Sequence, residues 1–326
     1  MPKVLISTVP FGEKDKFPLE LLSNNSIEYI LNPLHRKLKE DDLKGLIGNM
    51  DGLIAGTEII SDKVLKKANN LKIISRVGIG LDGIDLNYAK EKNINISYTP
   101  DAPGPAVAEM TIGLMISLLR SLHISNSQMH LGKWNRIFGR RIAEITIGII
   151  GVGRIGSRVL RRLKPFGTPK ILVNDVMPDH TIDGYLKVHW TTKNEIYKNA
   201  DLISLHLPLN TKTKDMITAK ELSLMKDNAL LINTSRGGII NEKDLFSALK
   251  KGKLGGVAID VFENEPYEGP LKNIERCLLT SHMGSMSEDC RTRMEIESTE
   301  EIVRFFNNEQ LKNPVPESEY NIQKGF

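Results

Sequence analysis

The stretch TIGIIGVGRIG, residues 146–156, decides how the second half of the chain is interpreted. It holds three glycines in the G-x-G-x-x-G register: Gly151, Gly153 and Gly156. That register alone is a weak sign of a nucleotide site, so its surroundings carry the inference. A β-branched run, Thr146–Ile150, precedes the glycines, and an amphipathic stretch, Ser157–Leu163, follows them. We therefore expect a turn from a strand into a helix, where the helix N-terminus favours a pyrophosphate.

A carboxylate after the next predicted strand strengthens this interpretation. Asp175 directly follows the apolar run Lys170–Asn174 and stands nineteen residues beyond Gly156. A carboxylate at this place accepts hydrogen bonds from the ribose hydroxyls of the adenosine and repels a 2′-phosphate. No arginine follows it in residues 176–180, so the sequence predicts NAD rather than NADP. The alternative is a solvated aspartate at the end of a strand.

Short apolar runs alternate with amphipathic stretches along almost the whole chain, which is typical of parallel α/β sheets. In the first hundred residues, the expected strands are Val4–Thr8, Ser26–Leu31, Asp51–Ala55, Lys72–Arg76 and Ile94–Tyr98. In the second half, they are Thr146–Ile150, Lys170–Asn174, Leu186–His189, Leu202–Leu205, Ala229–Asn233, Gly256–Ile259 and Cys277–Ser281. We therefore predict an α/β protein with two doubly wound parallel sheets, one flavodoxin-like and one of the Rossmann type.

Two helical segments link these sheets. The segment from Ala106 to about His130 is apolar around much of its circumference, which predicts that it is buried in a core or between subunits. A second pattern, Ser287–Phe306, is expected to return the chain to the first domain. The predicted domains are residues 1–101 together with 288–326, and residues 102–287.

Composition bounds the function. A length of 326 residues suggests two domains, and 40% hydrophobic with 26% charged residues is ordinary for a globular protein. The net charge of +4 gives no argument for nucleic acid or membrane partners. Two cysteines build no disulfide framework, and no Cys/His cluster has the spacing of a metal site. The longest apolar run, Met110–Leu119, is half of a membrane span, and the N-terminus does not resemble a signal peptide. We expect a soluble cytoplasmic protein without a metal.

Reactive side chains follow three predicted strands of the second half. LINTSRGG places Arg236 after one strand, and LLTSHMGS places His282 after the last. Between them, VAIDVFENEP places Asp260 at a strand end and Glu265 just before Pro266. Because ligands of open α/β sheets bind at the carboxyl ends of the strands, these side chains should converge.

These residue types fit hydride transfer to or from a small 2-oxo or 2-hydroxy acid. An arginine can hold the substrate carboxylate with two hydrogen bonds and polarise the adjacent carbonyl. A histidine can exchange the hydroxyl proton, and a carboxylate behind it fixes its orientation and favours its protonated form. Each residue alone has a structural explanation: a surface ion pair, a solvated loop carboxylate or a helix cap. Three of them behind a nucleotide-binding turn favour catalysis.

Several segments resemble, in order and spacing, the NAD-dependent D-isomer-specific 2-hydroxyacid dehydrogenases, in the branch that contains phosphoglycerate dehydrogenase. Besides the glycine turn, they are RVGIGLDGIDL (76–86), TPDAPGPAVAEMTIGLMISLLR (99–120), INTSRGG, AIDVFENEP and SHMGS. The resemblance covers nearly the whole chain. It implies an oxidoreductase with NAD as cofactor and a first domain that binds substrate. It also implies a homodimer, in which an arm around Trp134 exchanges between subunits.

The resemblance also implies a role for each site residue. Arg236 would bind the substrate, Glu265 would assist, and His282 would be the acid/base. The residues implied to bind the cofactor, besides the glycines and Asp175, are Arg154, Ile155, Leu207, Pro208, Thr234, Asp260 and Gly284. The residues implied to offer backbone N–H groups to the substrate carboxylate are Val77, Gly78, Ile79 and Gly80.

Departures from the family pattern bear on the substrate. Members that act on phosphoglycerate usually carry an arginine in the loop after the third strand, whereas Ala55–Glu58 has none. The chain ends about forty residues after His282, which leaves no room for their C-terminal regulatory domain. Glu265 argues against the formate dehydrogenases, which have glutamine there, and Val77–Leu81 lacks the lysine of phosphite dehydrogenases.

The substrate alternatives therefore stay open at this point. They include a dehydrogenase of 3-phosphoglycerate and a reductase of glyoxylate or hydroxypyruvate. A different class is an NAD-sensing transcriptional corepressor of the same fold, in which assembly matters more than turnover. The lack of long disordered extensions argues against that class.

Overall fold

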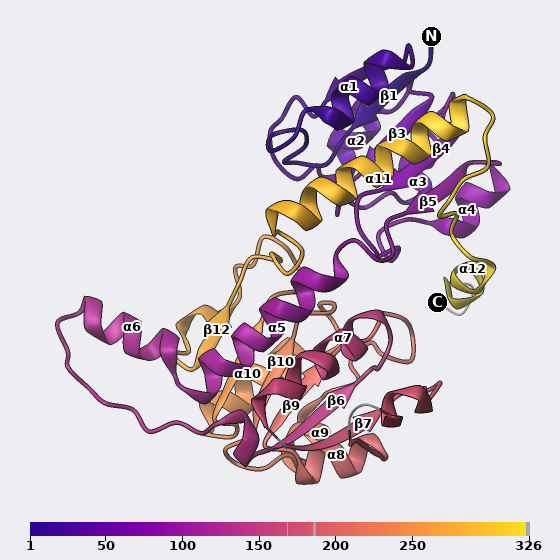
Figure 1. Cartoon of the computed structure of the whole chain (residues 1–326). Coiled ribbons are helices and arrows are strands. Elements are labelled where there is room, and N and C mark those ends of the chain that lie inside the picture. Colours follow the sequence, from indigo (N-terminus) through magenta and orange to yellow (C-terminus); the bar gives the residue numbers. More distant parts are fainter. Residues whose placement is uncertain (168, 185–186, 324–326) are drawn as a thin grey trace. The chain divides into compact units, whose positions relative to one another are not determined.

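A computed structural model describes residues 1–326 except for 168, 185–186 and 324–326. It divides into two compact units (Figure 1). Unit 1 comprises Met1–Pro103 and Met286–Phe326, and unit 2 comprises Gly104–Ser285. The expected boundaries, 1–101 with 288–326 and 102–287, differ from these by two residues at each junction.

Unit 1 contains a five-stranded sheet with the order β2-β1-β3-β4-β5, and all its neighbouring strands are parallel. The strands are β1 (Lys3–Ile6), β2 (Glu28–Leu31), β3 (Gly52–Ala55), β4 (Ile73–Arg76) and β5 (Asn95–Tyr98). This order is the flavodoxin-like one, so the predicted fold class is confirmed for unit 1. Each strand begins and ends within two residues of the predicted run.

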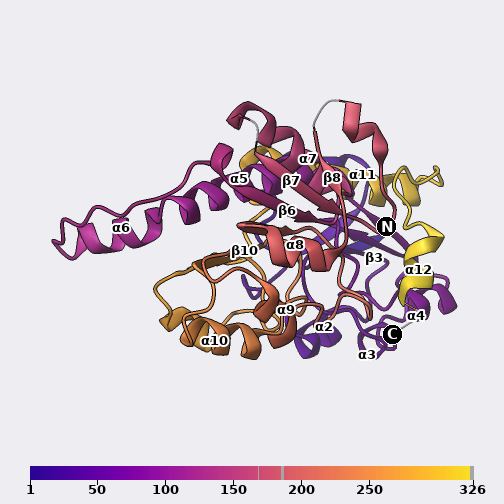
Figure 2. The same cartoon turned by 90° about the horizontal axis from the view of Figure 1, so that it is seen from below.

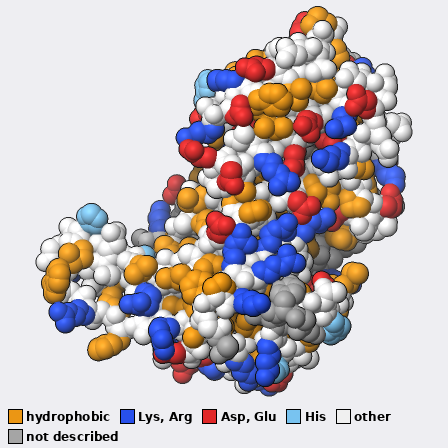
Figure 3. Space-filling view, viewed as in Figure 1, with side chains coloured by type: hydrophobic (Ala, Val, Ile, Leu, Met, Phe, Trp, Pro, Cys, Tyr) orange, Lys and Arg blue, Asp and Glu red, His pale blue; other side chains and the backbone are white. Residues whose placement is uncertain are grey.

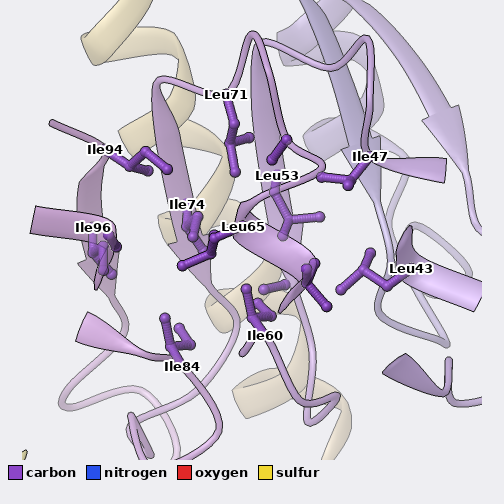
Figure 4. Packing of buried hydrophobic residues seen from close by; sticks show 14 of the residues in the cluster. Leu43, Ile47, Leu53, Ile60, Leu65, Leu71, Ile74, Ile84, Ile94 and Ile96 are labelled. Carbon is purple, nitrogen blue, oxygen red and sulfur yellow. The ribbon is translucent and has the colours of Figure 1, made fainter. Parts of the chain in front are cut away.

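Helices cover both faces of the unit 1 sheet, which explains why its strands are apolar on both sides. Val4 and Ile6 of β1 pack into one core, while Leu5 between them packs into the other. The helices of unit 1 are α1 (Phe17–Asn24), α2 (Glu40–Leu46), α3 (Asp62–Leu65), α4 (Leu86–Glu91), α11 (Glu288–Phe306) and α12 (Glu317–Gln323). Figure 4 shows the core under α2 and α3, where Leu65 lies beside Ile74 of the sheet and Leu43 points into the same cluster.

Unit 2 contains a seven-stranded sheet with the order β12-β11-β10-β9-β6-β7-β8, again all parallel. Its strands are β6 (Thr146–Ile150), β7 (Lys170–Asn174), β8 (His189–Trp190), β9 (Leu202–Leu205), β10 (Leu230–Asn233), β11 (Gly256–Ile259) and β12 (Cys277–Leu279). The order reverses at β6, as in the Rossmann fold, which confirms that prediction. The strand predicted at Leu186–His189 is shifted to His189–Trp190, and Leu186 lies outside the described residues.

The helices of unit 2 also form two layers (Figure 1). They are α5 (Gly104–Leu119), α6 (Leu122–His130), α7 (Arg154–Leu163), α8 (Lys193–Asn199), α9 (Ala219–Leu224) and α10 (Glu242–Lys250). Short 3₁₀ turns are η1 (Ile142–Glu144), η2 (Lys164–Phe166), η3 (His180–Gly184) and η4 (Pro270–Asn273). Helices α5 and α7 pack into one core, with Met115 and Val159 fully buried. Helices α8, α9 and α10 pack into the core on the other face.

The long helical segment expected from Ala106 to His130 is instead two helices. Helix α5 ends at Leu119, and Ser121 adopts a left-handed φ of 50° before α6 begins. Helix α5 buries eight residues, whereas α6 buries none and projects away from the sheet of unit 2 (Figure 2). The expectation of burial in a core is therefore wrong for α6, whose side chains become polar from Ser125 to Gln128, and burial between subunits stays a prediction. Among the described residues, no single helix is long and apolar enough to cross a membrane; α5 and α6 reach that length and hydropathy only together, bent by 65°.

Candidate active site

The glycine turn joins β6 to α7, and its three glycines meet different needs. Gly151 has a φ of +92°, and a Cβ on it would lie 2.3 Å from the carbonyl oxygen of His206. A Cβ on Gly156 would lie 2.0 Å from the carbonyl oxygen of Gly151. At Gly153, no atom of the described chain outside its immediate sequence neighbours lies within 4 Å of such a Cβ. Packing therefore requires two of the glycines, and the third leaves open space before the N-terminus of α7, where a pyrophosphate fits.

Asp175 follows β7 and is bound to the same turn. Its Oδ2 accepts a hydrogen bond from the backbone N–H of Val152 at 2.6 Å, and its Oδ1 accepts one from Met177 at 2.9 Å. The carboxylate thus lies beside the glycine turn, as the dinucleotide interpretation requires. Its oxygens can still accept from ribose hydroxyls, because each carboxylate oxygen has two lone pairs.

The loop after β9 lies against the other side of this turn. His206 is within 3.0 Å of the Ser204 hydroxyl through Nε2, and burial lowers the pKa of His206 to about 3, so its ring stays neutral. Leu207 is half-buried against the core, and Pro208 is exposed. An apolar surface next to the glycine turn is therefore present at Leu207 and Pro208.

The loop that carries Arg236 is shaped by the residue at the end of β10. Asn233 accepts hydrogen bonds from the backbone N–H and hydroxyl of Ser235, and its own Nδ2 donates to the carbonyl oxygen of Arg236 at 2.8 Å. A Cβ on Gly237 would lie 2.0 Å from the carbonyl oxygen of Phe262. The Arg236 loop therefore lies against the chain that leaves β11 and leads to Glu265.

Glu265 and His282 form a direct pair. Nδ1 of His282 lies 3.0 Å from each carboxylate oxygen of Glu265. Because an ionised carboxylate only accepts hydrogen bonds, Nδ1 is the donor, and Nε2 is the nitrogen that can face a substrate. The backbone N–H of Phe262 also donates to Oε1 of Glu265, at 3.2 Å, which helps to fix the position of the carboxylate.

Asp260 holds the turn that positions His282. The carboxylate is 1% exposed and accepts from the Thr280 hydroxyl at 2.6 Å and from the backbone N–H groups of Met283 and Gly284 at 2.9 Å. The carbonyl oxygen of Asp260 accepts from the N–H of His282, which has a φ of 52°. Left-handed backbone in a histidine is unfavourable unless its surroundings hold it, and Asp260 supplies that restraint.

Thr234 and Gly284 border this region. The hydroxyl of Thr234 lies 3.1 Å from that of Thr111 on α5, and both side chains are buried. A Cβ on Gly284 would lie 3.1 Å from Oδ2 of Asp260. Thr234 is thus oriented by α5, and glycine at position 284 allows the close approach to Asp260.

The loop Val77–Gly80 belongs to unit 1, where it follows β4. The N–H of Val77 donates to Ala55, and that of Gly78, with a φ of +138°, donates to the Thr99 hydroxyl at 2.7 Å. Within the described chain, the N–H groups of Ile79 and Gly80 have no acceptor. In this loop, the N–H groups of Ile79 and Gly80 are therefore the ones that could bind a substrate carboxylate. The N–H groups of Val77 and Gly78 already donate within unit 1.

The predicted residues of unit 2 thus come together at the carboxyl edge of one sheet. Sequence reasoning missed the residues that support them, above all Asn233, Thr280 and the N–H of Val152. One of these had a local signal, because an asparagine at a strand end followed two residues later by serine is typical of an Asx turn. The other two are contacts between segments far apart in the sequence.

Comparisons with known proteins agree with this arrangement. Residues 112–284 match the family model of the D-isomer specific 2-hydroxyacid dehydrogenase NAD binding domain. The D-3-phosphoglycerate dehydrogenase of Methanocaldococcus jannaschii is 36% identical over 85% of this chain and 54% of its own length. This chain therefore spans about half of that relative. The hydroxypyruvate reductase of Thermotoga maritima is 35% identical over 89% of this chain and 95% of its own length.

A solved structure agrees as well. The D-lactate dehydrogenase of Aquifex aeolicus, complexed with NAD and lactic acid, superposes with a TM-score of 0.85 and 27% identity, covering 96% of this chain and 98% of that one. The chain belongs to the D-isomer-specific 2-hydroxyacid dehydrogenases, which are NAD-dependent oxidoreductases, and carries their NAD-binding domain in unit 2. Its fold, family and cofactor are those that the sequence predicts.

Proposed function

We propose that this chain interconverts a small 2-oxo acid and the corresponding D-2-hydroxy acid. The observation that carries the proposal is the pair of Glu265 and His282, joined at 3.0 Å beside the Arg236 loop, at the sheet edge that holds the glycine turn. Relatives act, by their names, on phosphoglycerate and on hydroxypyruvate. Both chemistries, and reduction of glyoxylate, are candidate activities.

In this proposal, three side chains act on the substrate. NAD, when bound, supplies or accepts the hydride. Arg236 binds the substrate carboxylate through its planar guanidinium and polarises the neighbouring carbonyl. Nε2 of His282 donates a proton to the carbonyl oxygen during reduction and takes it back during oxidation. Glu265 holds the ring through Nδ1 and stabilises its positive charge, and Asp260 fixes the turn on which the ring stands.

The cofactor residues that the family resemblance implies are part of this proposal, and the geometry of the glycine turn supports it. Gly151, Gly153 and Gly156 would surround the pyrophosphate with Arg154 and Ile155, at the N-terminus of α7. Asp175 would bind the ribose, and Leu207 with Pro208 would contact the adenine. Thr234, Asp260 and Gly284 would lie at the nicotinamide end. In unit 1, we propose Ile79 and Gly80 as donors to the substrate carboxylate, and unit 1 as the substrate-binding domain.

We also propose a homodimer, in a cytoplasmic location. Helix α6 and the extended segment after it expose several hydrophobic side chains, among them Leu131 at 72%, Trp134 at 76% and Phe138 at 104% (Figure 3). So large an exposed apolar surface favours contact with a partner, and a second copy of the chain is the simplest one. Light scattering of the wild type and of Trp134→Ser with Phe138→Ser tests this, because the double variant should become monomeric.

Turnover with a panel of 2-oxo acids tests the central proposal. NADH consumption is followed with glyoxylate, pyruvate, hydroxypyruvate and 3-phosphohydroxypyruvate, and then with NADPH in place of NADH. We expect turnover of at least one acid, and a preference for NADH. Binding of NADH without turnover of any of these acids would contradict the proposal and favour an NAD-sensing binding protein.

A further inference from the structure

The first turn of α10, in unit 2, carries a carboxylate to which no role has been assigned. Oε1 of Glu242 accepts a hydrogen bond from the backbone N–H of Glu263 at 2.8 Å. Along the chain, Glu242 follows the Arg236 loop, and Glu263 belongs to the loop that leads from β11 to Glu265. A single hydrogen bond of Glu242 therefore joins the two loops that carry the proposed catalytic side chains.

The peptide bond between Phe262 and Glu263 lies where these loops meet. The N–H of Phe262 donates to Oε1 of Glu265 at 3.2 Å, and the next N–H donates to the carboxylate on α10. A Cβ on Gly237, in the Arg236 loop, would lie 2.0 Å from the carbonyl oxygen of Phe262 and 2.5 Å from the nitrogen of Glu263. The backbone of the Arg236 loop therefore packs directly against this peptide.

A continuous series of contacts leads from Glu242 to the histidine of the candidate site. Glu242 binds one N–H group of the peptide segment, and the preceding N–H group, that of Phe262, binds Glu265. Both carboxylate oxygens of Glu265 lie 3.0 Å from Nδ1 of His282. All of these distances are in the range of well-formed hydrogen bonds. A displacement of the peptide would therefore move the Glu265 carboxylate relative to the ring of His282.

The position of Glu242 is electrostatically unfavourable. The side chain is half-buried, and burial raises its pKa; the hydrogen bond from Glu263 opposes this rise, and the negative charges of Glu263 and Glu265 add to it. Like charges that stand close together away from bulk water destabilise each other. A carboxylate that only stabilised the N-terminus of α10 would not need to stand near Glu265. The arrangement therefore favours a role at the candidate site.

A second carboxylate on the same helix provides a comparison. Oδ2 of Asp244 accepts from the backbone N–H of Ala219 at 2.8 Å, at the start of α9. Asp244 and Glu242 are both half-buried, and both stand in the first turn of α10, where the helix dipole favours a negative charge. The two differ in the segment that they hold: Asp244 binds α9, whereas Glu242 binds the loop of Glu265.

We propose that Glu242 is a positioning residue: its hydrogen bond to the backbone of Glu263 keeps the Glu265 carboxylate in place against His282. The inference rests on the proposed function and deepens it, since Glu242 acts on the reaction only through the pair of Glu265 and His282. The effect of Glu242 should therefore require an acceptor oxygen at this position, and it should disappear when His282 is absent.

Three single variants test the hydrogen bond, with NADH and the 2-oxo acid of the panel that the wild type reduces fastest. Glu242→Ala should lower kcat by about tenfold, which is part of what general acid–base catalysis contributes. Glu242→Gln keeps an acceptor oxygen and should stay within about twofold of the wild type. Asp244→Ala is the matched control, because it removes an equivalent hydrogen bond from the same turn of α10, and its kcat should also stay within about twofold.

A double-mutant cycle with His282→Ala then separates positioning from a general structural role. The ring through which Glu242 acts is absent in His282→Ala, so the addition of Glu242→Ala should change the residual kcat by less than about twofold. A merely structural role would lower kcat by the same factor in both backgrounds. Fluorescence titration should give the same Kd of NADH with and without Glu242→Ala.

Three results would overturn the inference: equal effects of Glu242→Ala in the two backgrounds, a Glu242→Gln protein as slow as Glu242→Ala, or a Glu242→Ala protein as fast as the wild type. If Glu242→Ala does not fold, Glu242→Ser makes the same test, because serine is favoured near helix N-termini and its side chain is shorter than that of glutamate. A wild type that reduces none of the acids would instead overturn the proposed function, so the two failures are distinguishable.

Discussion

The two units share one architecture and differ in what the carboxyl edges of their sheets carry. At the edge of unit 2 stand side chains that can transfer protons and bind anions, namely Arg236, Glu265 and His282. At the edge of unit 1, the N–H groups of Ile79 and Gly80 have no acceptor within the described chain, and the carboxylate of Glu58 is buried beside Ser7 and Gly56. Because both sheets are buried on both faces, the residue types in their strands have little freedom to vary. The difference teaches that the fold sets the place of a site and the loops set its chemistry.

The same contrast holds for the buried charges that support each edge. In unit 2, the carboxylate of Asp260 collects N–H and hydroxyl donors from the turn of His282. In unit 1, the guanidinium of Arg76 collects the carbonyl oxygens of Val77 and Gly80. The anionic Asp260 stabilises a turn that carries a reactive side chain, whereas the cationic Arg76 binds carbonyl oxygens of a loop in which the N–H groups of Ile79 and Gly80 have no acceptor within the described chain. We expect variants to separate these two roles.

The largest effect should come from His282→Ala. Removal of the acid/base should lower kcat by about 10³-fold, within the range of general acid–base catalysis, while NADH still binds. His35→Ala, at an exposed histidine of unit 1, is the matched control and should keep full activity. Steady-state kinetics and NADH fluorescence titration measure both. A His282→Ala protein with kcat near that of the wild type would place the chemistry elsewhere.

A smaller effect is expected from Arg236→Lys, with Arg76→Lys as its counterpart in unit 1. Arg236→Lys should lower kcat/KM by about 10²-fold with an unchanged Tm, because a point charge replaces the bidentate fork. Arg76→Lys should lower stability by about 1–2 kcal/mol, since one ammonium group cannot bridge the two carbonyl oxygens as the guanidinium does. It should also raise KM more than it lowers kcat. If both variants lose kcat equally, the contrast between the two edges is wrong.

Asp175→Ala should have the next largest effect, on cofactor choice. Loss of the carboxylate removes the proposed ribose hydrogen bonds and the repulsion of a 2′-phosphate together, so kcat/KM with NADH should fall by about tenfold and the gap to NADPH should narrow. The N–H of Val152 also loses its acceptor, which should loosen the glycine turn. The ratio of kcat/KM for the two cofactors is the measurement. A wild type that prefers NADPH would contradict the role given to Asp175.

The sequence predicted the sheets closely, for a physical reason. Four strands of unit 2, among them Thr146–Ile150 and Gly256–Ile259, match their predicted runs residue for residue. Strands buried on both faces are continuous apolar runs, so their ends are marked where polar or turn residues begin. The candidate site could also be predicted, because its side chains stand in the loops that follow such runs.

What the sequence did not reveal depends on contacts between distant segments. The break at Ser121 depends on a single left-handed residue, and serine carries little signal for that conformation. The direction of the N–H groups in Val77–Gly80 depends on Thr99, more than twenty residues away along the chain. Likewise, the absence of an arginine after β3 was visible, but the burial of Glu58 beside Ser7 was not.

The smallest expected effect concerns how the free energy of unfolding changes in acid because of His206 in unit 2. Burial lowers the pKa of His206 from 6.5 to about 3, so the folded chain keeps this ring neutral where the unfolded chain binds a proton. Because the unfolded state takes up more protons as the pH falls through 6.5, this group makes unfolding easier in acid. Between pH 7 and pH 6, it should reduce the free energy of unfolding by about 0.7 kcal/mol.

His206→Gln removes the titrating ring and can keep a hydrogen bond with Ser204, so it should flatten the dependence of stability on pH by that amount. His35→Gln is the matched control, because His35 is an exposed histidine of unit 1. Urea midpoints of the three proteins at pH 7 and pH 6 measure the difference. If His206→Gln loses as much stability in acid as the wild type does, then protons reach the ring in the folded state. Water would in that case reach His206, which lies against the glycine turn and directly precedes Leu207. The apolar surface that we propose for the adenine would then have to lie elsewhere in unit 2.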